Sequence, residues 1–298
     1  MNATIRIPVP AEFNFAVNLD YLSRSPDESL YRIRGGKLYK TIPVGTLTPL
    51  FEVCGDEPGC LLVSSLDEGQ WDASTKEAVI RYVRDWFDLD NDLEPFYTMS
   101  REDPILSDVV PRLYGLRNMG IPDLFEALCW GIIGQQINLA FAYTLKRRFV
   151  EAFGRQVGRG DVDCWLFPDP EQVAELTVED ITALKMTTKK AEYLIGVARL
   201  IAEGQLSKEL LLESSSFREA EKKLVAIRGI GPWTANYVLM RCLRYPNAFP
   251  IDDVGLHNAI KSVLHMEQKP TPARIKELAV GWKNWEAYST FYLWRVLY

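Results

Sequence analysis

The sequence predicts an α+β protein, with an antiparallel sheet domain over residues 1–103 followed by an all-helical domain over residues 104–298. Two changes near residue 104 support this division. Short β-leaning runs separated by Gly and Pro give way to apolar positions at helical spacing. The charge changes as well, since the first domain holds 10 Lys and Arg against 18 Asp and Glu, and the second holds 24 against 22.

In the first domain, short apolar runs bounded by turn residues are typical of strands. They include FNFAVNL, SLYRIRG, KLYKTI and CLLVSS. The stretch STKEAVIRYVRDWFD, residues 74–88, instead has apolar side chains at positions 79, 82, 83, 86 and 87. This is the spacing of a helix that packs on the sheet.

The second domain is predicted to hold about eight or more helices. Gly, Pro and Ser interrupt its helical pattern at residues 120–122, 154–161, 168–170, 204, 214–216 and 270–272. The chain contains no internal repeat and no low-complexity tract, so each predicted helix has its own place in the fold.

Residues 222–240 predict two helices joined by a tight Gly-Ile-Gly turn. Glycine permits a positive φ and leaves no Cβ between the backbone and a ligand. Pro232 suits the first turn of the second helix, whose unpaired N–H groups attract an anion such as a nucleic-acid phosphate. The candidate phosphate-binding residues are Gly229, Ile230 and Gly231, with nearby positive charge from Lys222, Lys223 and Arg228.

Two adjacent carboxylates follow this turn. A Gly-x-Gly turn alone is more often a plain helix connection than a binding site. Here, however, Pro250 ends the preceding segment, and Asp252 and Asp253 stand before an amphipathic helix that starts near Val254. Either aspartate could simply cap that helix, but one acceptor is enough for a cap. We therefore predict that the other carboxylate has a separate role.

The stretches LVAIRGIGPWTANYVLM and FPIDDVGLHNAI together resemble the helix-hairpin-helix (HhH-GPD) DNA glycosylase superfamily, and within it the 3-methyladenine DNA glycosylase II group. Three further segments extend the resemblance over most of the chain: FEALCWGIIGQQIN, MTTKKAEYLIGVARLIAEG and WKNWEAYSTFYLW. The resemblance implies a sheet domain before a two-lobed helical domain with the catalytic cleft between the lobes. Residues 112–230 would form one lobe, and the first domain with the last helices would support the other.

In this family the catalytic aspartate directly precedes a helix, which matches Asp253 before Val254 and leaves Asp252 as a capping or solvent-facing neighbour. Breaking an N-glycosidic bond leaves positive charge on the sugar, and a preorganised carboxylate stabilises it. Relatives that also cut the DNA strand carry a lysine where this chain has Trp233. The resemblance therefore implies a monofunctional enzyme that removes alkylated purines and leaves an abasic site.

Aromatic residues are expected to form the base pocket, because Trp233, Tyr237 and Trp294 match pocket positions of the 3-methyladenine group. Electron-rich rings stack well on a methylated, positively charged purine. The alternative for Tyr237 and Trp294 is burial in the helical core, and the sequence gives the two interpretations equal weight.

The loop after residue 134 is expected to fill the gap that an extruded base leaves in the duplex. Gln135, Gln136 and Ile137 are the candidates. A leucine of relatives aligns with Gln136, so this chain departs from that pattern. An ordinary polar helix terminus is the alternative interpretation.

The resemblance also implies a monovalent cation, bound by backbone carbonyls that align with Val225, Ile227 and Ile230. No other cofactor is expected. Some relatives hold an iron-sulfur cluster with four cysteines after the catalytic aspartate, but no cysteine follows Cys242 here. The five cysteines are scattered, as is typical of reduced structural thiols, and His257 and His265 lack the Cys partners of a metal site.

The expected partner is double-stranded DNA with damaged bases, bound by a monomer. The formal net charge is −6, so the DNA-binding residues would form a local patch. With 47% hydrophobic residues, no signal-peptide pattern and no apolar run of membrane-spanning length, the chain is expected in the cytoplasm. Other interpretations remain open: a glycosylase for deaminated or oxidised bases, a non-catalytic helix-hairpin-helix DNA-binding protein, and a helical interaction scaffold.

Overall fold

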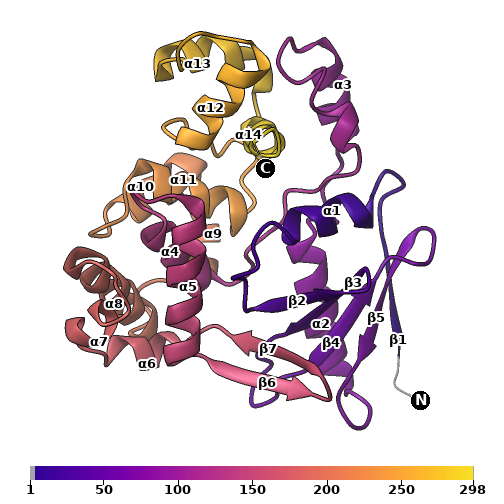
Figure 1. Ribbon diagram of the computed structural model, residues 1–298, viewed down its shortest axis with the longest axis vertical. Coiled ribbons are helices and arrows are strands. Elements are labelled where there is room, and N and C mark those ends of the chain that lie inside the picture. Colours follow the sequence, from indigo (N-terminus) through magenta and orange to yellow (C-terminus); the bar gives the residue numbers. More distant parts are fainter. Residues whose placement is uncertain (1–3, 298) are drawn as a thin grey trace.

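A computed structural model describes residues 4–297 and confirms the predicted α+β fold, with a sheet at one end and helices at the other (Figure 1). The sheet is antiparallel throughout, with strand order β1-β5-β4-β3-β2. Its strands are β1 Thr4–Pro8, β2 Tyr31–Arg34, β3 Lys37–Thr41, β4 Leu50–Cys54 and β5 Cys60–Ser65. Leu38, Val53 and Val63 stand opposite one another on neighbouring strands, and all three are fully buried. They mark the core face of the sheet.

Three helices accompany the sheet: α1 Phe15–Leu22, α2 Ala73–Trp86 and α3 Glu94–Glu102. The predicted helix over residues 74–88 is α2, and its buried residues include Val79, Val83 and Trp86. The prediction of a strand at FNFAVNL was wrong, because most of this run belongs to α1. Asn14 accounts for the difference, since its side chain accepts a hydrogen bond from the Val17 N–H and so caps the helix.

The helical domain is built around α4, in which every residue except Glu126 is buried. Helix α4 packs against α8 and α11. The α-helices after the sheet domain are α4 Leu124–Ile133, α5 Leu139–Phe153, α6 Pro170–Ala174, α7 Val178–Thr182, α8 Thr188–Ala202, α9 Lys208–Leu212, α10 Phe217–Val225, α11 Pro232–Arg241, α12 Val254–Val263, α13 Pro272–Leu278 and α14 Glu286–Trp294. Two 3₁₀ helices, η1 Pro111–Leu113 and η2 Ala279–Trp282, complete this part of the chain.

A second, two-stranded sheet interrupts the helices where the sequence predicted only a break at residues 154–161. Its strands are β6 Arg155–Arg159 and β7 Val162–Leu166. The Trp165 N–H donates a 3.1 Å hydrogen bond to the Ser29 carbonyl, and β7 lies against β2 and β3 (Figure 1). The hairpin therefore connects the middle of the chain to the N-terminal sheet. Polar residues fill most of β6, which hid the strand from pattern analysis.

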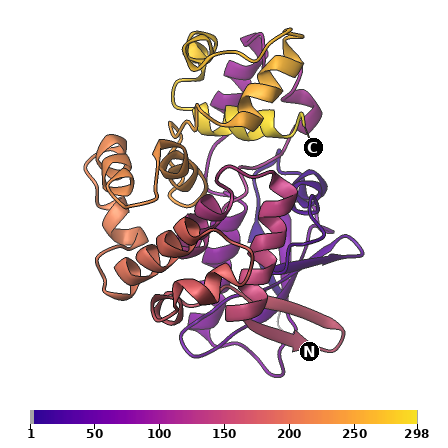
Figure 2. The same ribbon diagram turned by 60° about the vertical axis from the view of Figure 1, so that its left-hand side comes forward.

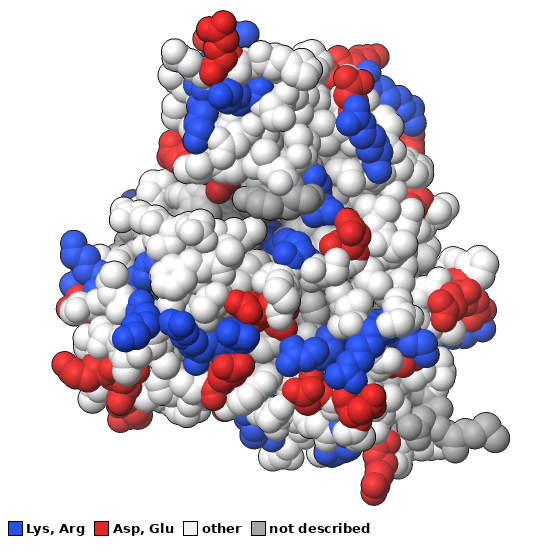
Figure 3. Space-filling model, viewed as in Figure 1, with Lys and Arg blue, Asp and Glu red and all other residues white. Residues whose placement is uncertain are grey.

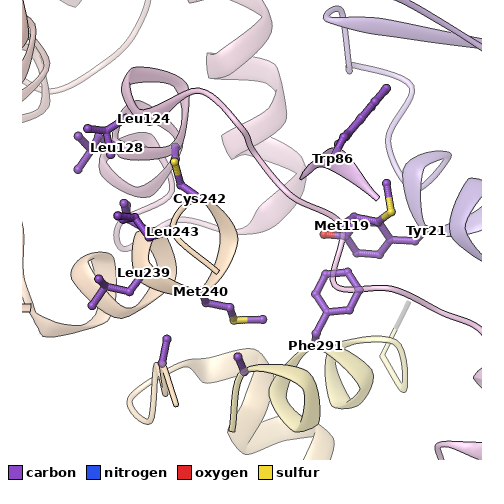
Figure 4. Close-up of a cluster of buried hydrophobic side chains, with 14 of the residues drawn as sticks. Tyr21, Trp86, Met119, Leu124, Leu128, Leu239, Met240, Cys242, Leu243 and Phe291 are labelled. Atoms are coloured by element: carbon purple, nitrogen blue, oxygen red, sulfur yellow. The ribbon is translucent and has the colours of Figure 1, made fainter. Parts of the chain in front are cut away.

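The first domain also contacts the last helices. The Tyr21 ring of α1 lies 4.6 Å from that of Phe291 in α14, and Phe96 of α3 lies 5.1 Å from Tyr292. Figures 1 and 2 both show α3 beside the C-terminal helices. In Figure 4, Tyr21, Met119 and Phe291 point toward one another within one buried cluster. One continuous core thus joins the two predicted domains and fixes their relative position.

Among residues 4–297, no helix is both long enough and apolar enough to cross a lipid bilayer.

Candidate functional site

Asp253 is the N-cap of α12 and lies at the edge of a cavity. Its Oδ1 accepts a 2.7 Å hydrogen bond from the Leu256 N–H, while Asp252 is exposed. The prediction that capping and a separate role fall on different carboxylates was wrong, because Asp253 both caps the helix and faces the cavity. Asp252 was expected to be either a capping or a solvent-facing residue, and the structure shows that it faces solvent.

Two tryptophans hold the carboxylate of Asp253. The Trp233 Nε1–H donates to Oδ2 at 2.9 Å, and the Trp294 Nε1–H donates to Oδ1 at 2.8 Å. Indole nitrogen is a donor only, so each ring can serve the carboxylate in a single orientation. With the Leu256 N–H, three donors from α11, α12 and α14 fix the plane of one negatively charged group.

The cavity beside Asp253 has a volume of about 170 Å³ and an aromatic wall. Tyr237 lies between the two tryptophans, since its ring centre is 5.6 Å from that of Trp233 and 6.0 Å from that of Trp294, with interplanar angles of 29° and 30°. All three predicted pocket aromatics therefore line one cavity. Tyr237 is also almost fully buried, so it belongs to the helical core and at the same time lines the cavity, and its role in base binding stays a prediction.

Sequence reasoning missed the opposite wall. It includes Tyr21 and Arg24 from the N-terminal domain and Trp130 from α4. Arg24 lies 3.8 Å from the centre of the Tyr21 ring, and its Nε–H donates to the Tyr143 hydroxyl at 2.7 Å. No local signal marks Tyr21 or Arg24, because only the tertiary fold brings α1 to α11.

Arg241 and Arg295 also line the cavity. Arg241 is buried, and it donates to the Met119 carbonyl at 2.6 Å and to the Tyr237 hydroxyl at 3.0 Å. Arg241 was not predicted from the sequence. It could have been found as a charged residue within the apolar run of α11, four positions after Tyr237 and therefore on the same face of the helix. Burial raises the pKa of Tyr237 while Arg241 lowers it, and the net shift is upward. Tyr237 therefore stays protonated at neutral pH.

The predicted hairpin consists of α10, the Gly-Ile-Gly turn and α11. Gly229 has a φ of +94°, and a Cβ at this position would collide with the ring of Tyr193. Gly231 is the N-cap of α11 and supplies no side-chain cap, while Pro232 occupies the first turn. The N–H groups of this helix terminus are therefore free to meet an anion.

A groove of about 970 Å³ runs beside the hairpin and reaches Asp253. Its lining residues are 134–138, 193, 225–234 and 252–254. Arg228 lines this groove and pairs with Glu192 at 2.5 Å. Lys222 and Lys223 do not line it, and Lys223 instead donates to Ser214 at 3.0 Å. Only one of the three predicted cations thus faces the groove.

The loop between α4 and α5 forms the other side of the groove. The Gln135 side chain donates to the Gly229 carbonyl at 2.9 Å and to the Thr234 hydroxyl at 3.1 Å, so it connects this loop to the hairpin. Gln136 is exposed and has a φ of +58°, while Ile137 is half-buried. All three candidates for the gap-filling residue line the groove, and Gln136 is the most exposed of them.

The turn carbonyls predicted to bind a cation lie at the end of α10 and in the turn itself. The Ile227 carbonyl accepts a 3.0 Å hydrogen bond from the Ile230 N–H, which closes the turn. Val225, Ile227 and Ile230 all line the groove. The carbonyl oxygens of these three residues are neutral ligands, which suit a monovalent cation. Within residues 4–297, no cluster of His, Cys, Asp and Glu side chains has the arrangement of a metal site.

On the face shown in Figure 3, Lys and Arg side chains are interleaved with Asp and Glu. The formal net charge of the chain is −6, so an anionic ligand would be held by local donors rather than by a long-range field.

Both parts of the chain match known families. Residues 129–284 match the model of the HhH-GPD superfamily base excision DNA repair proteins, and residues 22–128 match that of the 8-oxoguanine DNA glycosylase N-terminal domain. The chain is 51% identical over 302 residues to the DNA-3-methyladenine glycosylase of Bacillus subtilis, an alignment that covers 100% of this chain and 98% of that protein.

Two solved structures share the fold. The 3-methyladenine DNA-glycosylase from Archaeoglobus fulgidus matches with a TM-score of 0.85 at 24% identity, covering 98% of this chain and 97% of that one. The 8-oxoguanine glycosylase/lyase of Clostridium acetobutylicum, solved with double-stranded DNA, matches with a TM-score of 0.74 at 19% identity, covering 99% of this chain and 96% of that one.

Proposed function

The chain belongs to the HhH-GPD superfamily of base excision DNA repair proteins, and on this premise we propose that it hydrolyses the N-glycosidic bond of alkylated purines in double-stranded DNA. The resemblance noted in the sequence is confirmed, and the chain is a DNA glycosylase of the 3-methyladenine type. The observation that carries the proposal is the position of Asp253, held by two indole N–H groups at the edge of an aromatic cavity.

The cavity would take up the base after it has left the stack. Trp233, Tyr237 and Trp294 offer electron-rich ring faces there, which attract a purine whose ring carries positive charge after methylation. Such a base is already a good leaving group. The pocket therefore gains more from stacking than from a precise set of hydrogen bonds, and this favours a range of alkylated purines.

Asp253 would act on the sugar. As the bond from C1′ to the base nitrogen breaks, positive charge develops on the sugar, and a carboxylate of fixed orientation stabilises it. The same carboxylate can orient or deprotonate the attacking water. Because Trp233 and Trp294 donate to different oxygens, the carboxylate needs no reorientation during the reaction.

The residues that line the cavity favour hydrolysis without strand cleavage. A Schiff base requires an amine nucleophile, and among the described residues the cavity lining contains arginines but no lysine. Trp233 stands where relatives that also cut the DNA strand carry a lysine, and its only polar side-chain atom donates to Asp253. The product would be an abasic site in an intact strand.

DNA would bind along the groove beside the hairpin. The N–H groups at Gly231 would meet a phosphate, with Arg228 supplying positive charge, and Gln136 would fill the gap left by the base. A monovalent cation on the carbonyls of the turn would add further attraction to that phosphate.

Release of free bases from three defined duplexes tests the substrate class. Duplexes with methylated, deaminated or oxidised purines are incubated with the protein, and the released bases are identified by mass. We expect release of methylated purines. The match to the 8-oxoguanine glycosylase N-terminal domain makes oxidised bases the second candidate, and their preferential release would contradict the proposal.

A further inference from the structure

A second, smaller cavity lies directly behind the base cavity. Its volume is about 40 Å³. Five residues line both cavities and form the wall between them: Tyr21, Arg24, Trp130, Tyr237 and Arg241. Whatever occupies the small cavity therefore acts on the base pocket.

The charges around this small cavity do not balance. Four cations line it, Arg24, Lys40, Lys146 and Arg241, against two carboxylates, Glu28 and Glu126. Both carboxylates are engaged by Lys146, at 3.0 Å and 3.1 Å. Within the described chain, the other three cations have no carboxylate within ion-pair distance.

The hydrogen-bond partners of these three cations are all neutral oxygens, and each cation also lies over a tyrosine ring. Arg24 donates to a tyrosine hydroxyl, and Arg241 donates to a carbonyl and a second hydroxyl. The Lys40 amine donates to the Leu30 carbonyl at 3.1 Å and has two further N–H groups. Only 5% of Lys40 is exposed, and burial lowers its pKa despite the opposing effect of Glu126 and Glu28.

Buried charges are usually paired, and Lys40 and Arg241 are buried while Arg24 is half-buried. A net positive cavity lining, with an underused ammonium group, therefore calls for an anion. The small volume of the cavity favours a compact anion over a bulky organic one. The Tyr143 hydroxyl accepts from Arg24 and keeps its own proton free to donate, so it adds a neutral donor to the cation set.

We propose that this cavity is a binding site for a monovalent, halide-sized anion, which is chloride under ordinary conditions. The anion sits among Lys40, Arg24 and Arg241 and offsets their charge. It also lowers the positive potential at the shared wall, where a cationic purine would stack on Tyr237. The anion thus favours charged lesions over neutral ones in the pocket.

Bromide, which scatters anomalously, locates the site. Crystals of the full chain are soaked in bromide in place of chloride. We expect an anomalous peak inside the small cavity, within hydrogen-bond reach of the Lys40 amine. Peaks confined to the outer surface, with water alone in the cavity, would overturn the proposal without bearing on the glycosylase reaction.

Thermal unfolding provides a second test in solution. The unfolding midpoint is compared in about 200 mM sodium chloride and in sodium gluconate at the same ionic strength. We expect the midpoint to lie roughly 2–4 °C higher in chloride, because an anion that binds only the native state stabilises it.

Two lysine variants separate this effect from general salt effects. Lys40→Met should abolish the difference between chloride and gluconate, whereas Lys269→Met, at an exposed position, should retain it. An equal chloride effect in both variants would contradict the site. Should Lys40→Met not fold, the bromide map of the unaltered chain still decides the question.

Discussion

The Trp233 indole N–H donates a 2.9 Å hydrogen bond to Oδ2 of Asp253, twenty positions further along the chain. This contact joins the first turn of α11 to the N-terminus of α12. The same tryptophan lines the base cavity and lies on the groove beside the hairpin. One residue thus connects DNA docking, base stacking and orientation of the carboxylate.

Replacing Trp233 with Phe tests the orienting role, because it keeps an aromatic ring and removes the N–H. We expect single-turnover base release from a methylated duplex to fall by about 10- to 100-fold, the value of one hydrogen bond to a charged group. Trp71→Phe is the matched control, since Trp71 donates to Asp67 at 3.0 Å away from the site. Equal rates for the two variants would show that the ring alone matters.

Borohydride reduction of a reacting mixture tests for a covalent intermediate. Because Trp233 replaces the lysine of strand-cutting relatives and no lysine lines the cavity within the described chain, we expect no trapped protein–DNA adduct. The products are separated on a denaturing gel beside those of a known glycosylase/lyase. A shifted band from this protein would contradict monofunctional hydrolysis.

Gly229→Ala tests the hairpin turn. The substitution places a Cβ against Tyr193 at a φ of +94°, so we expect a loss of roughly 2 kcal/mol or more in the free energy of unfolding and weaker DNA binding. Gly204→Ala is the control, since Gly204 has a φ of +70° but open space around it. Urea unfolding and DNA titration are measured for both variants. Gly204→Ala reports the cost of a positive φ alone, and Gly229→Ala adds the contact of the new Cβ with Tyr193. Equal effects would show that Tyr193 is not the obstacle.

Arg228→Ala tests which cation faces DNA. Arg228 lines the groove, whereas Lys222 does not. Removing one phosphate contact should reduce the slope of log affinity against log salt by about 1. We expect this for Arg228→Ala and a smaller change for Lys222→Ala, measured by fluorescence anisotropy over a salt series. A larger change for Lys222→Ala would place the DNA along α10 instead.

The sequence identified Trp233, Tyr237, Asp253 and Trp294 through the family resemblance, and all four line the cavity. Helical spacing accounts for the proximity of Trp233 and Tyr237 within α11, whereas Asp253 and Trp294 come from the N-terminus of α12 and from α14. Tyr21 in α1 and Arg24 just after it reach the same cavity, more than 200 positions away, by tertiary packing that no local pattern encodes. The error at FNFAVNL has a local origin instead, since a single cap at Asn14 outweighed the strand-like composition.

Two assignments needed the three-dimensional path of the backbone. Lys222 and Lys223 precede the turn closely in sequence, but α10 carries their side chains outside the groove. The roles of Asp252 and Asp253 depend on which carboxylate begins α12. A helix boundary shifts by a residue or two in any pattern-based prediction, and here one residue decides which side chain faces the cavity.

Base release by Asp253→Asn tests the central claim most directly. Asparagine still caps a helix, but its amide nitrogen would face one indole N–H, so thermal unfolding and DNA titration of the variant accompany the rate measurement. In single-turnover assays on a methylated duplex, we expect its rate to fall by about 1,000-fold or more, because the negative charge beside the sugar is lost. Asp252→Asn, at an exposed neighbouring position, should release the base at close to the original rate. Normal release by Asp253→Asn, with loss of release in Asp252→Asn, would contradict the account.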